Sequence, residues 1–296
     1  MTPASAAIET DDLGKQYGAI RGLADLSLRV EFGEIFGFLG PNGAGKTTTI
    51  RVLTGLLAPT VGTARVLGHD VAGPDGLWRR DLGYLPGELS FWPALSGERT
   101  LGLLGDLTGR PAVWRAELLE RLQWSSGDLS RRVGAYSDGM KQKLGIVQAL
   151  QCAPRLVLLD EPTKGLDPLV QQAFYELLED LAKRGTTVFF SSHVLPEVER
   201  VCTRVAMLRA GRLMSVGTVD QLRGALPRRV VVTFAADVET ILAEFGDVIA
   251  RSPRRIELLV AAARVPALVT SLGALPLADL LIEAQSLEEA FLERYR

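Results

Sequence analysis

The chain has 296 residues, with 33 Lys and Arg against 35 Asp and Glu, which gives a formal net charge of −2. This length allows one large core and a smaller second domain. A non-specific nucleic-acid binder carries a basic excess, so the near-neutral balance argues against that class of protein.

Nothing in the sequence predicts a secretory signal or a membrane span. Residues 1–12 contain no basic segment followed by an apolar one. The most apolar long stretch, 256–282, is interrupted by charged residues and prolines and falls short of about 20 continuous apolar residues. Cys152 and Cys202 lie in apolar segments and lack the spacing of metal ligands, which predicts buried thiols in a reducing compartment. We therefore expect a soluble chain that meets a membrane only through a partner.

The first predicted elements are a strand, a second strand, a glycine-rich loop and a helix. In segment 23–34, apolar Leu26, Leu28 and Val30 alternate with polar residues, as in a half-buried strand. The sequence then reads EIFGFLGPNGAGKTTTIRVLTGLLAP. It gives a short apolar strand, a loop, and a helix that we expect to end before Pro59.

The loop in this segment fills the pattern G-x-x-x-x-G-K-[ST] in the strand–loop–helix context that a phosphate-binding loop requires. Its glycines let backbone N–H groups surround the β- and γ-phosphates, Lys46 adds a positive charge, and the Thr47 hydroxyl is a Mg²⁺ ligand. The predicted nucleotide-binding residues are Gly40, Pro41, Asn42, Gly43, Ala44, Gly45, Lys46, Thr47 and Thr48. The sequence therefore predicts a nucleotide-binding protein.

The stretch 136–150, YSDGMKQKLGIVQAL, predicts a helix whose N-cap is Ser137. The positive end of this helix, with Gly139 allowing close approach to the backbone, is suited to an anion. The local sequence leaves both roles open, a simple cap or an anion site.

Two further apolar strands are each followed by side chains that could take part in catalysis or metal binding. Residues 156–159 read as a buried parallel strand that ends in Asp160 and Glu161. In P-loop NTPases an acid at the first position holds the Mg²⁺ water shell, and a second acid beside the γ-phosphate can polarise an attacking water. Segment 186–194 is another such strand, and His193 follows it at the strand end where ligands collect in open α/β sheets.

Taken in chain order, these motifs resemble those of the ATPase subunits of ABC (ATP-binding cassette) transporters. The resemblance covers roughly residues 8–220 and depends on GPNGAGKT, YSDGM in place of the signature LSGGQ, LVLLDE as Walker B, GLD as the D-loop and SSH as the switch histidine. It implies an α/β fold with a RecA-like P-loop NTPase core, an N-terminal antiparallel β subdomain and a helical signature subdomain at about 88–150.

The resemblance also implies a head-to-tail dimer that holds two ATP molecules, each between the phosphate loop of one copy and the signature helix of the other. Residues that would face the other copy's nucleotide are Ser137, Asp138, Gly139, Met140 and Asp167. Thr47 and Asp160 would hold Mg²⁺. Glu161 and His193 would be catalytic, and the ring of Tyr17 would stack on adenine.

Three places depart from the family pattern. In the signature, Asp138 replaces a glycine and Met140 a glutamine, and we expect the Asp138 carboxylate to point outward because it would otherwise repel the γ-phosphate. Gly87 stands where the family has the Q-loop glutamine that links the metal site to the membrane partner, and Glu88 is a candidate replacement. Lys164 stands where a small or amide residue is usual, and the sequence does not explain it.

Phe91 and Trp92, just after the Q-loop position, either pack under the helical subdomain or dock a coupling helix of a membrane subunit. We place the ATP-binding domain at 1–220 and an accessory domain at 221–296. The second segment reads as β-α-β-β-α-β, a ferredoxin-like α+β order, followed by an amphipathic helix at 286–295. It resembles the extension of cassette ATPases that serve type-2 exporters, and a regulatory and a dimer-stabilising role both stay open.

We therefore expect an ATP- and Mg²⁺-dependent hydrolase that dimerises with itself or a paralogous cassette subunit and powers export of a drug, antibiotic or lipid. Its partner would be a separate integral-membrane type-2 permease, at the cytoplasmic face of the cell membrane, and it would bind no nucleic acid. One alternative is a soluble cassette ATPase that acts on nucleic acid or the ribosome, although the single phosphate loop and the absence of sustained heptads argue against it. Another is a binding module without catalysis, against which the intact catalytic motifs argue. The substrate itself is not encoded here, because the family's selectivity lies mainly in the membrane subunit.

Overall fold

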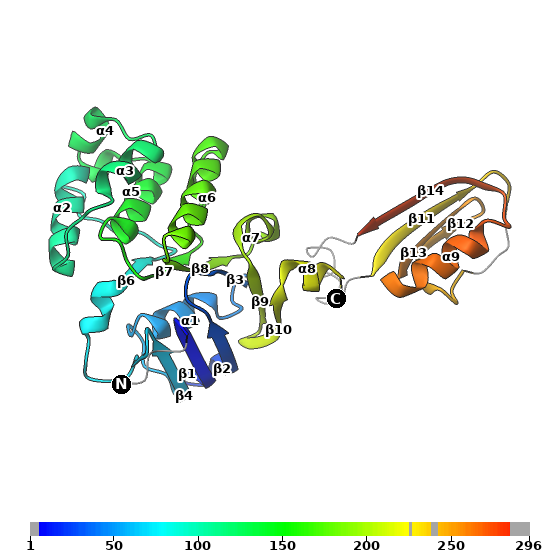
Figure 1. The fold of residues 1–296 in the computed structure, drawn as a ribbon, viewed down its shortest axis with the longest axis horizontal. Helices are drawn as coiled ribbons and strands as arrows, with labels where there is room; N and C mark the ends of the chain where they lie inside the picture. The colour runs from blue at the N-terminus through cyan, green and yellow to red at the C-terminus, as the bar shows by residue number, and fades with distance from the viewer. Residues whose placement is uncertain (1–5, 225–226, 238–241, 285–296) are drawn as a thin grey trace. The chain divides into compact units, whose positions relative to one another are not determined.

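The computed structural model describes residues 6–224, 227–237 and 242–284. The chain divides into two compact units, Met1–Val216 and Gly217–Arg296 (Figure 1). The boundary falls close to residue 220, where the sequence pattern changes.

An antiparallel sheet near the N-terminus has the strand order β2–β1–β4–β5. Its strands are β1 (Ile8–Tyr17), β2 (Ile20–Val30), β4 (Val61–Val66) and β5 (His69–Asp70). Strand β1 lies between β2 and β4, and its register with β2 runs from Ile8 opposite Val30 to Tyr17 opposite Ile20. The residues Leu26 and Leu28, which alternate with polar neighbours in the sequence, are buried on one face of β2.

A six-stranded sheet carries the functional motifs and has the order β10–β9–β3–β8–β7–β6. Its strands are β3 (Ile35–Leu39), β6 (Leu82–Leu85), β7 (Leu156–Asp160), β8 (Thr187–Ser192), β9 (Arg204–Arg209) and β10 (Arg212–Thr218). Strands β3, β7 and β8 are buried at every residue and pair in parallel, which explains why their sequences are runs of mainly apolar residues. Their carboxyl ends therefore meet at one edge of the sheet.

Helices cover this sheet and position the loops at that edge. They are α1 (Lys46–Leu53), the 3₁₀ helix η1 (Leu77–Asp81), α6 (Pro168–Lys183) and α7 (Leu195–Val201). Helix α1 is shorter than predicted: it ends at Leu53 rather than just before Pro59, because Gly55 adopts a φ of 71° that a helix cannot continue. In the core, the Phe189 ring of β8 stacks on Phe36 of β3 at 5.9 Å.

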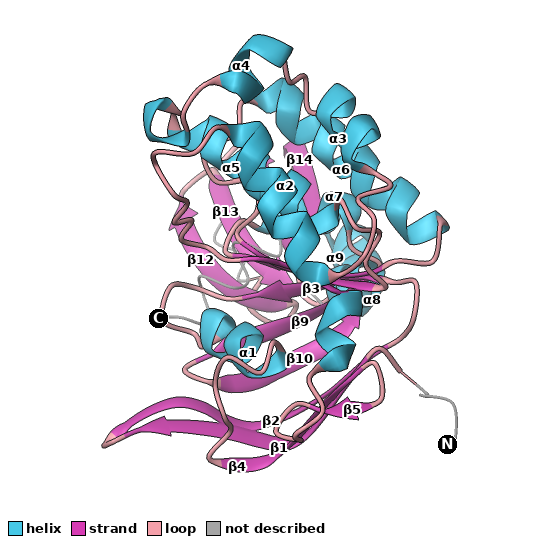
Figure 2. Ribbon diagram, turned by 90° about the vertical axis from the view of Figure 1, so that its left-hand side faces the viewer, coloured by secondary structure: helices cyan, strands magenta, loops and turns pink. Residues whose placement is uncertain are grey.

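A group of helices lies on one side of the six-stranded sheet, away from the antiparallel sheet, in both Figure 1 and Figure 2. It consists of α2 (Gly97–Thr108), α3 (Arg115–Arg121), α4 (Ser126–Ser130), the 3₁₀ helix η2 (Val133–Ala135) and α5 (Asp138–Leu150). Leu144, Val147 and Leu150 of α5 are fully buried. Both free thiols, Cys152 and Cys202, are buried as predicted, and burial raises the pKa of the Cys202 thiol.

The second unit is a four-stranded antiparallel sheet of order β12–β13–β11–β14 with a helix against it. Its elements are α8 (Val219–Gly224), β11 (Arg228–Phe234), β12 (Gly246–Ser252), β13 (Arg255–Val260), the 3₁₀ helix η3 (Ala262–Arg264), α9 (Val265–Leu272) and β14 (Leu277–Ala284). The strand order is that of the ferredoxin-like pattern. The predicted helix at 286–295 lies outside the described residues. Across the described ranges, no helix has the length and hydrophobicity needed to cross a membrane.

Candidate nucleotide and catalytic site

The loop between β3 and α1 has the backbone of an anion-binding loop. Gly43 and Gly45 have φ values of 79° and 106°, which glycine adopts without strain. The Lys46 ammonium is buried inside the loop and donates to the carbonyl oxygens of Gly40 at 2.7 Å and Pro41 at 3.2 Å. Burial lowers the pKa of Lys46, and the nearby carboxylates of Glu161 and Asp160 oppose that shift. The loop thus presents backbone N–H groups and one cation at the start of α1.

Asp160, at the end of β7, connects this loop to β8. Its Oδ2 accepts a hydrogen bond from Thr47 Oγ1 at 2.8 Å, and its Oδ1 accepts one from Ser191 Oγ at 2.6 Å. Hydroxyl and carboxylate oxygens are the ligands that Mg²⁺ prefers, and 2.8 Å fits two neighbouring positions around one ion or its water shell. The donor set of Thr47 and Asp160 therefore fits the predicted metal.

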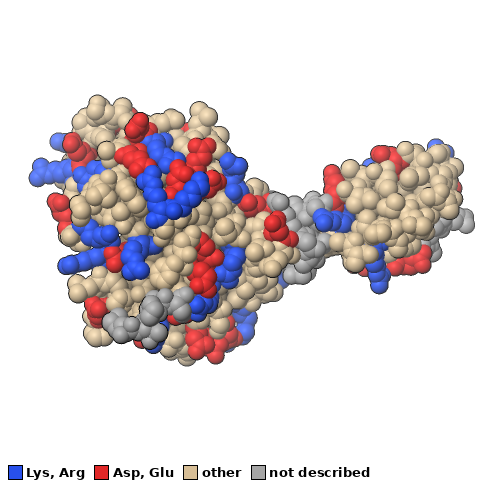
Figure 3. Space-filling view, viewed as in Figure 1, with Lys and Arg blue, Asp and Glu red and all other residues tan. Residues whose placement is uncertain are grey.

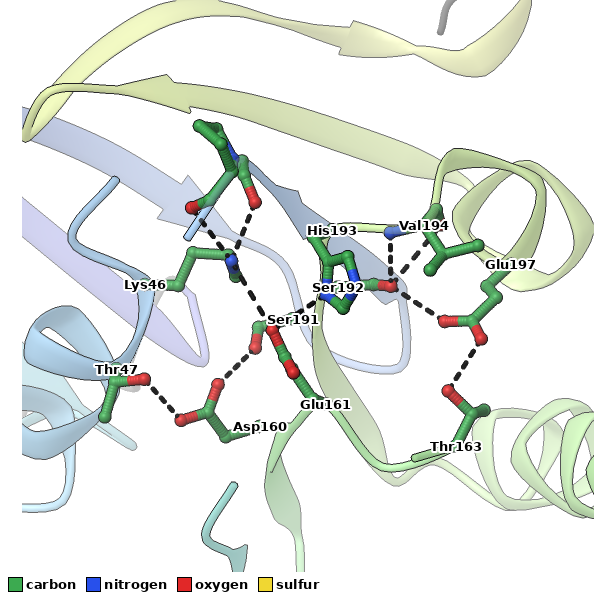
Figure 4. Close-up of polar contacts among 12 residues, drawn as sticks. Lys46, Thr47, Asp160, Glu161, Thr163, Ser191, Ser192, His193, Val194 and Glu197 are labelled. Carbon is green, nitrogen blue, oxygen red and sulfur yellow. Dashed lines mark hydrogen bonds and ion pairs between the residues drawn. The ribbon is translucent and has the colours of Figure 1, made fainter. Parts of the chain in front are cut away.

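Glu161 turns out of the strand with a φ of 50°, an uncommon conformation for a residue with a side chain. Its Oε1 lies 2.9 Å from His193 Nδ1 and 3.7 Å from Lys46 Nζ (Figure 4). Strained backbone of this kind concentrates at functional sites, where surrounding contacts maintain it. The structure thus brings the predicted base, the phosphate-loop lysine and the switch histidine into one cluster.

The signature residues lie outside that cluster. Ser137 caps α5 by accepting a hydrogen bond from the Met140 amide at 3.3 Å. The Asp138 side chain is 97% exposed, with Lys141 Nζ at 3.5 Å, so it points outward as expected. A Cβ on Gly139 would lie 2.6 Å from the Gly165 carbonyl oxygen. Only a glycine therefore lets α5 begin this close to the turn that follows β7.

Asp167 and Tyr17 also lie apart from the cluster. The Asp167 carboxylate caps α6 by accepting hydrogen bonds from the amides of Leu169 at 3.1 Å and Val170 at 3.0 Å. Tyr17 is exposed at the end of β1, with Lys15 Nζ 5.7 Å from its ring centroid. Its ring is therefore available for stacking on a base.

The Q-loop position borders the metal site. A cavity of about 190 Å³ extends from Asp160 and Glu161 to Gly87, Glu88 and Lys164. A Cβ on Gly87 would lie 3.3 Å from Asp160 Oδ2, so position 87 faces the predicted Mg²⁺ ligand. In the described part of the chain, the side chains of Glu88 and Lys164 have no hydrogen bond or ion pair. The structure thus places Lys164 on the wall of this cavity together with Glu88.

The two aromatic residues after the Q-loop differ in exposure. Trp92 is 49% exposed, whereas Phe91 is partly buried. An indole with half of its surface in solvent is available to a partner.

Sequence reasoning missed one residue, Glu197 on α7. Its two carboxylate oxygens accept hydrogen bonds from Thr163 Oγ1 and Ser192 Oγ, each at 2.7 Å (Figure 4). The only signal in the sequence is an acid four positions after His193, in the first turn of a helix, which alone is typical of a favourable helix dipole contact.

A comparison with protein families finds that residues 23–164 match the family described as ABC transporter. The daunorubicin/doxorubicin resistance ATP-binding protein DrrA of Streptomyces peucetius is 37% identical over 235 residues, covering 78% of this chain and 71% of the relative. The chain belongs to the ATP-binding subunits of ABC transporters. It is accordingly an ATP-binding, ATP-hydrolysing transporter subunit.

Other relatives of this ABC ATPase support the same family assignment. The bacitracin transport ATP-binding protein BcrA of Bacillus licheniformis is 36% identical, covering 74% of this chain and 72% of the relative. The doxorubicin resistance ATP-binding protein DrrA of Mycobacterium tuberculosis is 32% identical, and its alignment covers 97% of this chain and 92% of the relative, so it includes the second unit. A solved ATP-binding subunit of an ABC transporter superposes with a TM-score of 0.69 at 33% identity, over 74% of this chain and 92% of that one.

Proposed function

We propose that two copies of this chain enclose two ATP molecules and that hydrolysis powers export of a drug, antibiotic or lipid through a separate type-2 membrane permease. The observation that carries the proposal is the cluster of Lys46, Glu161 and His193, in which one carboxylate oxygen lies 2.9 Å from the imidazole and 3.7 Å from the ammonium. The class of cargo follows from relatives named for daunorubicin, doxorubicin and bacitracin.

The cluster supports a sequence of roles for these side chains. The loop amides and Lys46 bind the β- and γ-phosphates, and the ammonium exchanges its two carbonyl acceptors for phosphate oxygens. Thr47 and Asp160 would hold Mg²⁺, which would neutralise charge on the phosphates when bound. Glu161 orients the attacking water and accepts its proton, while His193 holds the Glu161 carboxylate in place.

The position of the signature supports the dimer. Ser137 and Asp138 are exposed at the N-terminal end of α5, and neither belongs to the cluster of Lys46 and Glu161. A phosphate held by a second copy can therefore approach the positive end of α5 without competition from its own chain. Asp167, at the start of α6, would lie at the same interface.

Permease docking is assigned to Phe91 and Trp92, since they follow Gly87 and Glu88, two residues that line the same cavity as Asp160, and since Trp92 is 49% exposed. This role places the protein at the cytoplasmic face of the membrane. Action on nucleic acid is disfavoured: on the face of the first unit seen in Figure 3, basic and acidic side chains lie side by side and form no continuous basic patch.

Export can be tested in a drug-sensitive bacterium that expresses this chain together with its permease. We expect growth at higher concentrations of at least one member of a panel that includes an anthracycline, a peptide antibiotic and a lipid-like toxin. The matched control is Lys46→Ala, which removes the phosphate-loop cation and should abolish the protection. Equal sensitivity of the two strains across the panel, although the wild-type chain hydrolyses ATP, would contradict an export role for these substrate classes.

A further inference from the structure

Glu197, in the first turn of α7, joins two loops of the site. Its Oε1 accepts a hydrogen bond from Thr163 Oγ1 at 2.7 Å, and its Oε2 accepts one from Ser192 Oγ at 2.7 Å (Figure 4). Thr163 and Ser192 are both buried, and Glu197 itself is partly buried. Each carboxylate oxygen therefore serves a different loop, and both bonds are the strong, charge-assisted kind.

The two loops carry the reactive groups. Thr163 lies two residues after Glu161, and Ser192 directly precedes His193. Ser192 Oγ also accepts a hydrogen bond from the Val194 amide at 2.9 Å, so this hydroxyl fixes the backbone on both sides of the histidine. The contact of 2.9 Å between His193 Nδ1 and Glu161 Oε1 joins the same two loops that the Glu197 carboxylate bridges.

The environment of Glu197 does not suggest an ordinary ion pair. In the described part of the chain, no basic side chain pairs with its carboxylate, which leaves the two hydroxyl groups as its partners. Tyr175 lies close enough that the charge of Glu197 adds to burial in raising the pKa of Tyr175 to about 12. Partial burial of an acid without a counter-ion costs free energy unless hydrogen bonds replace its lost hydration, and the two hydroxyl groups provide these bonds.

We propose that Glu197 is a positioning residue for ATP hydrolysis: it fixes His193 against Glu161 and links that contact to the turn that leads from Thr163 to Asp167. This inference rests on the proposed roles of Glu161 and His193. Its carboxylate contacts the hydroxyl groups of Thr163 and Ser192 and acts through them.

Kinetics on the full chain separate this role from nucleotide binding. Glu197→Ala removes both acceptors, and kcat should fall about 10- to 100-fold, because small misplacements of reacting groups cost that much. The KM for Mg·ATP should stay within about two-fold, since Lys46 and Thr47 do not contact Glu197 and an interaction lost only in the transition state lowers kcat. Glu197→Gln keeps one acceptor and can donate from its amide, so its kcat should lie between that of the wild type and that of Glu197→Ala.

Two further variants sharpen the comparison. Thr163→Val removes one donor with little change in shape and should lower kcat without changing KM. If Glu197→Ala does not fold, Thr163→Val carries the kinetic test. Glu176→Ala removes a carboxylate from the neighbouring helix α6, where it accepts a hydrogen bond from Gln172 at 2.7 Å, and should leave kcat unchanged.

A spectroscopic measurement reports on the histidine itself. The chain has two histidines, His69 and His193, so a His69→Gln variant assigns both imidazole resonances in an NMR spectrum. Loss of the Glu197 bridge should shift or broaden the His193 resonance and leave that of His69 in place. The inference is overturned if the His193 resonance and kcat stay as in wild type, or if kcat and KM change together. If the wild-type chain does not hydrolyse ATP, the proposed function fails, and the resonance of His193 still decides whether Glu197 positions it.

Discussion

At the scale of single residues, the site depends on the charges of Lys46, Asp160 and Glu161, which lie close together. The Glu161 and Asp160 carboxylates raise the pKa of Lys46 while burial lowers it, and the ammonium is held by two carbonyl oxygens. A phosphate that enters the loop offers Lys46 stronger acceptors than these carbonyl groups. In the proposed mechanism, Glu161 keeps its contact with His193 and faces the γ-phosphate, which is the arrangement a general base requires.

Glu161→Gln should bind ATP but lose turnover, by about 100-fold or more, because the amide accepts the same hydrogen bonds but takes up no proton. Steady-state phosphate release measures turnover, and gel filtration with Mg·ATP should show an accumulated dimer. Hydrolysis near the wild-type rate would remove Glu161 from the role of base.

Gly87→Gln should alter the response of ATPase activity to the permease more than it alters basal hydrolysis. A side chain at this position points at Asp160, since its Cβ would lie 3.3 Å from Oδ2, and a glutamine can reach the metal's water shell from there. If Glu88 now supplies that link, Glu88→Ala should depress permease-stimulated activity in the native background.

Glu88→Ala should lower permease-stimulated activity less in the Gly87→Gln background than in the native one, with a coupling free energy between the two changes of about 0.5 kcal/mol or more. ATPase assays on the reconstituted complex, with both single variants and the double, give this coupling. Purely additive effects would show that Glu88 is not the replacement for the missing amide.

At the scale of elements, the turn after β7 is where the site is assembled. Gln142 of α5 donates from Nε2 to the Pro162 carbonyl at 2.7 Å, and Gly139 lies against the Gly165 carbonyl. Helix α5 and the turn thus form one packed unit. This unit connects the signature helix to the strand that ends in Asp160.

Gly139→Ala should therefore destabilise the fold by about 1–3 kcal/mol, because a Cβ at 2.6 Å from a carbonyl oxygen forces helix and turn apart. Gly102, inside α2, has open space around the same position. Gly102→Ala should stabilise the fold by about 0.5–1 kcal/mol through helix propensity. Denaturant unfolding measures both, and equal effects of the two changes would contradict the packed unit.

Local patterns predicted many of these elements and missed the contacts between them. The buried runs of β3, β7 and β8, and the Ser137 cap of α5, follow from residues within one segment. The early end of α1 also has a local signal, which the prediction overlooked, because Gly55 directly follows the C-cap Thr54 and has a φ of 71°. Glu197 has no such local signal: its partner Thr163 is 34 positions away in the chain, and only the fold brings them together.

At the scale of the whole molecule, each copy in the proposed dimer would supply two separate halves of a site. The phosphate loop, Asp160, Glu161 and His193 form a cluster, while the signature at Ser137 is exposed elsewhere on the same unit. The resemblance to the family implied both halves and that each would face a different nucleotide. The second unit has the strand order of a ferredoxin-like sheet, and the alignment with one relative covers 97% of this chain.

The most direct test of the shared site is a mixture of two inactive variants. Lys46→Ala disables the phosphate loop, and Ser137→Asp keeps the helix cap but places a carboxylate where the partner's γ-phosphate would lie. Each variant alone should hydrolyse almost no ATP. Mixed in equal amounts, they should regain about a quarter of wild-type activity, since half of the dimers are mixed and each mixed dimer has one intact site of two. No recovery in the mixture, with both variants folded, would contradict an ATP site shared between two copies.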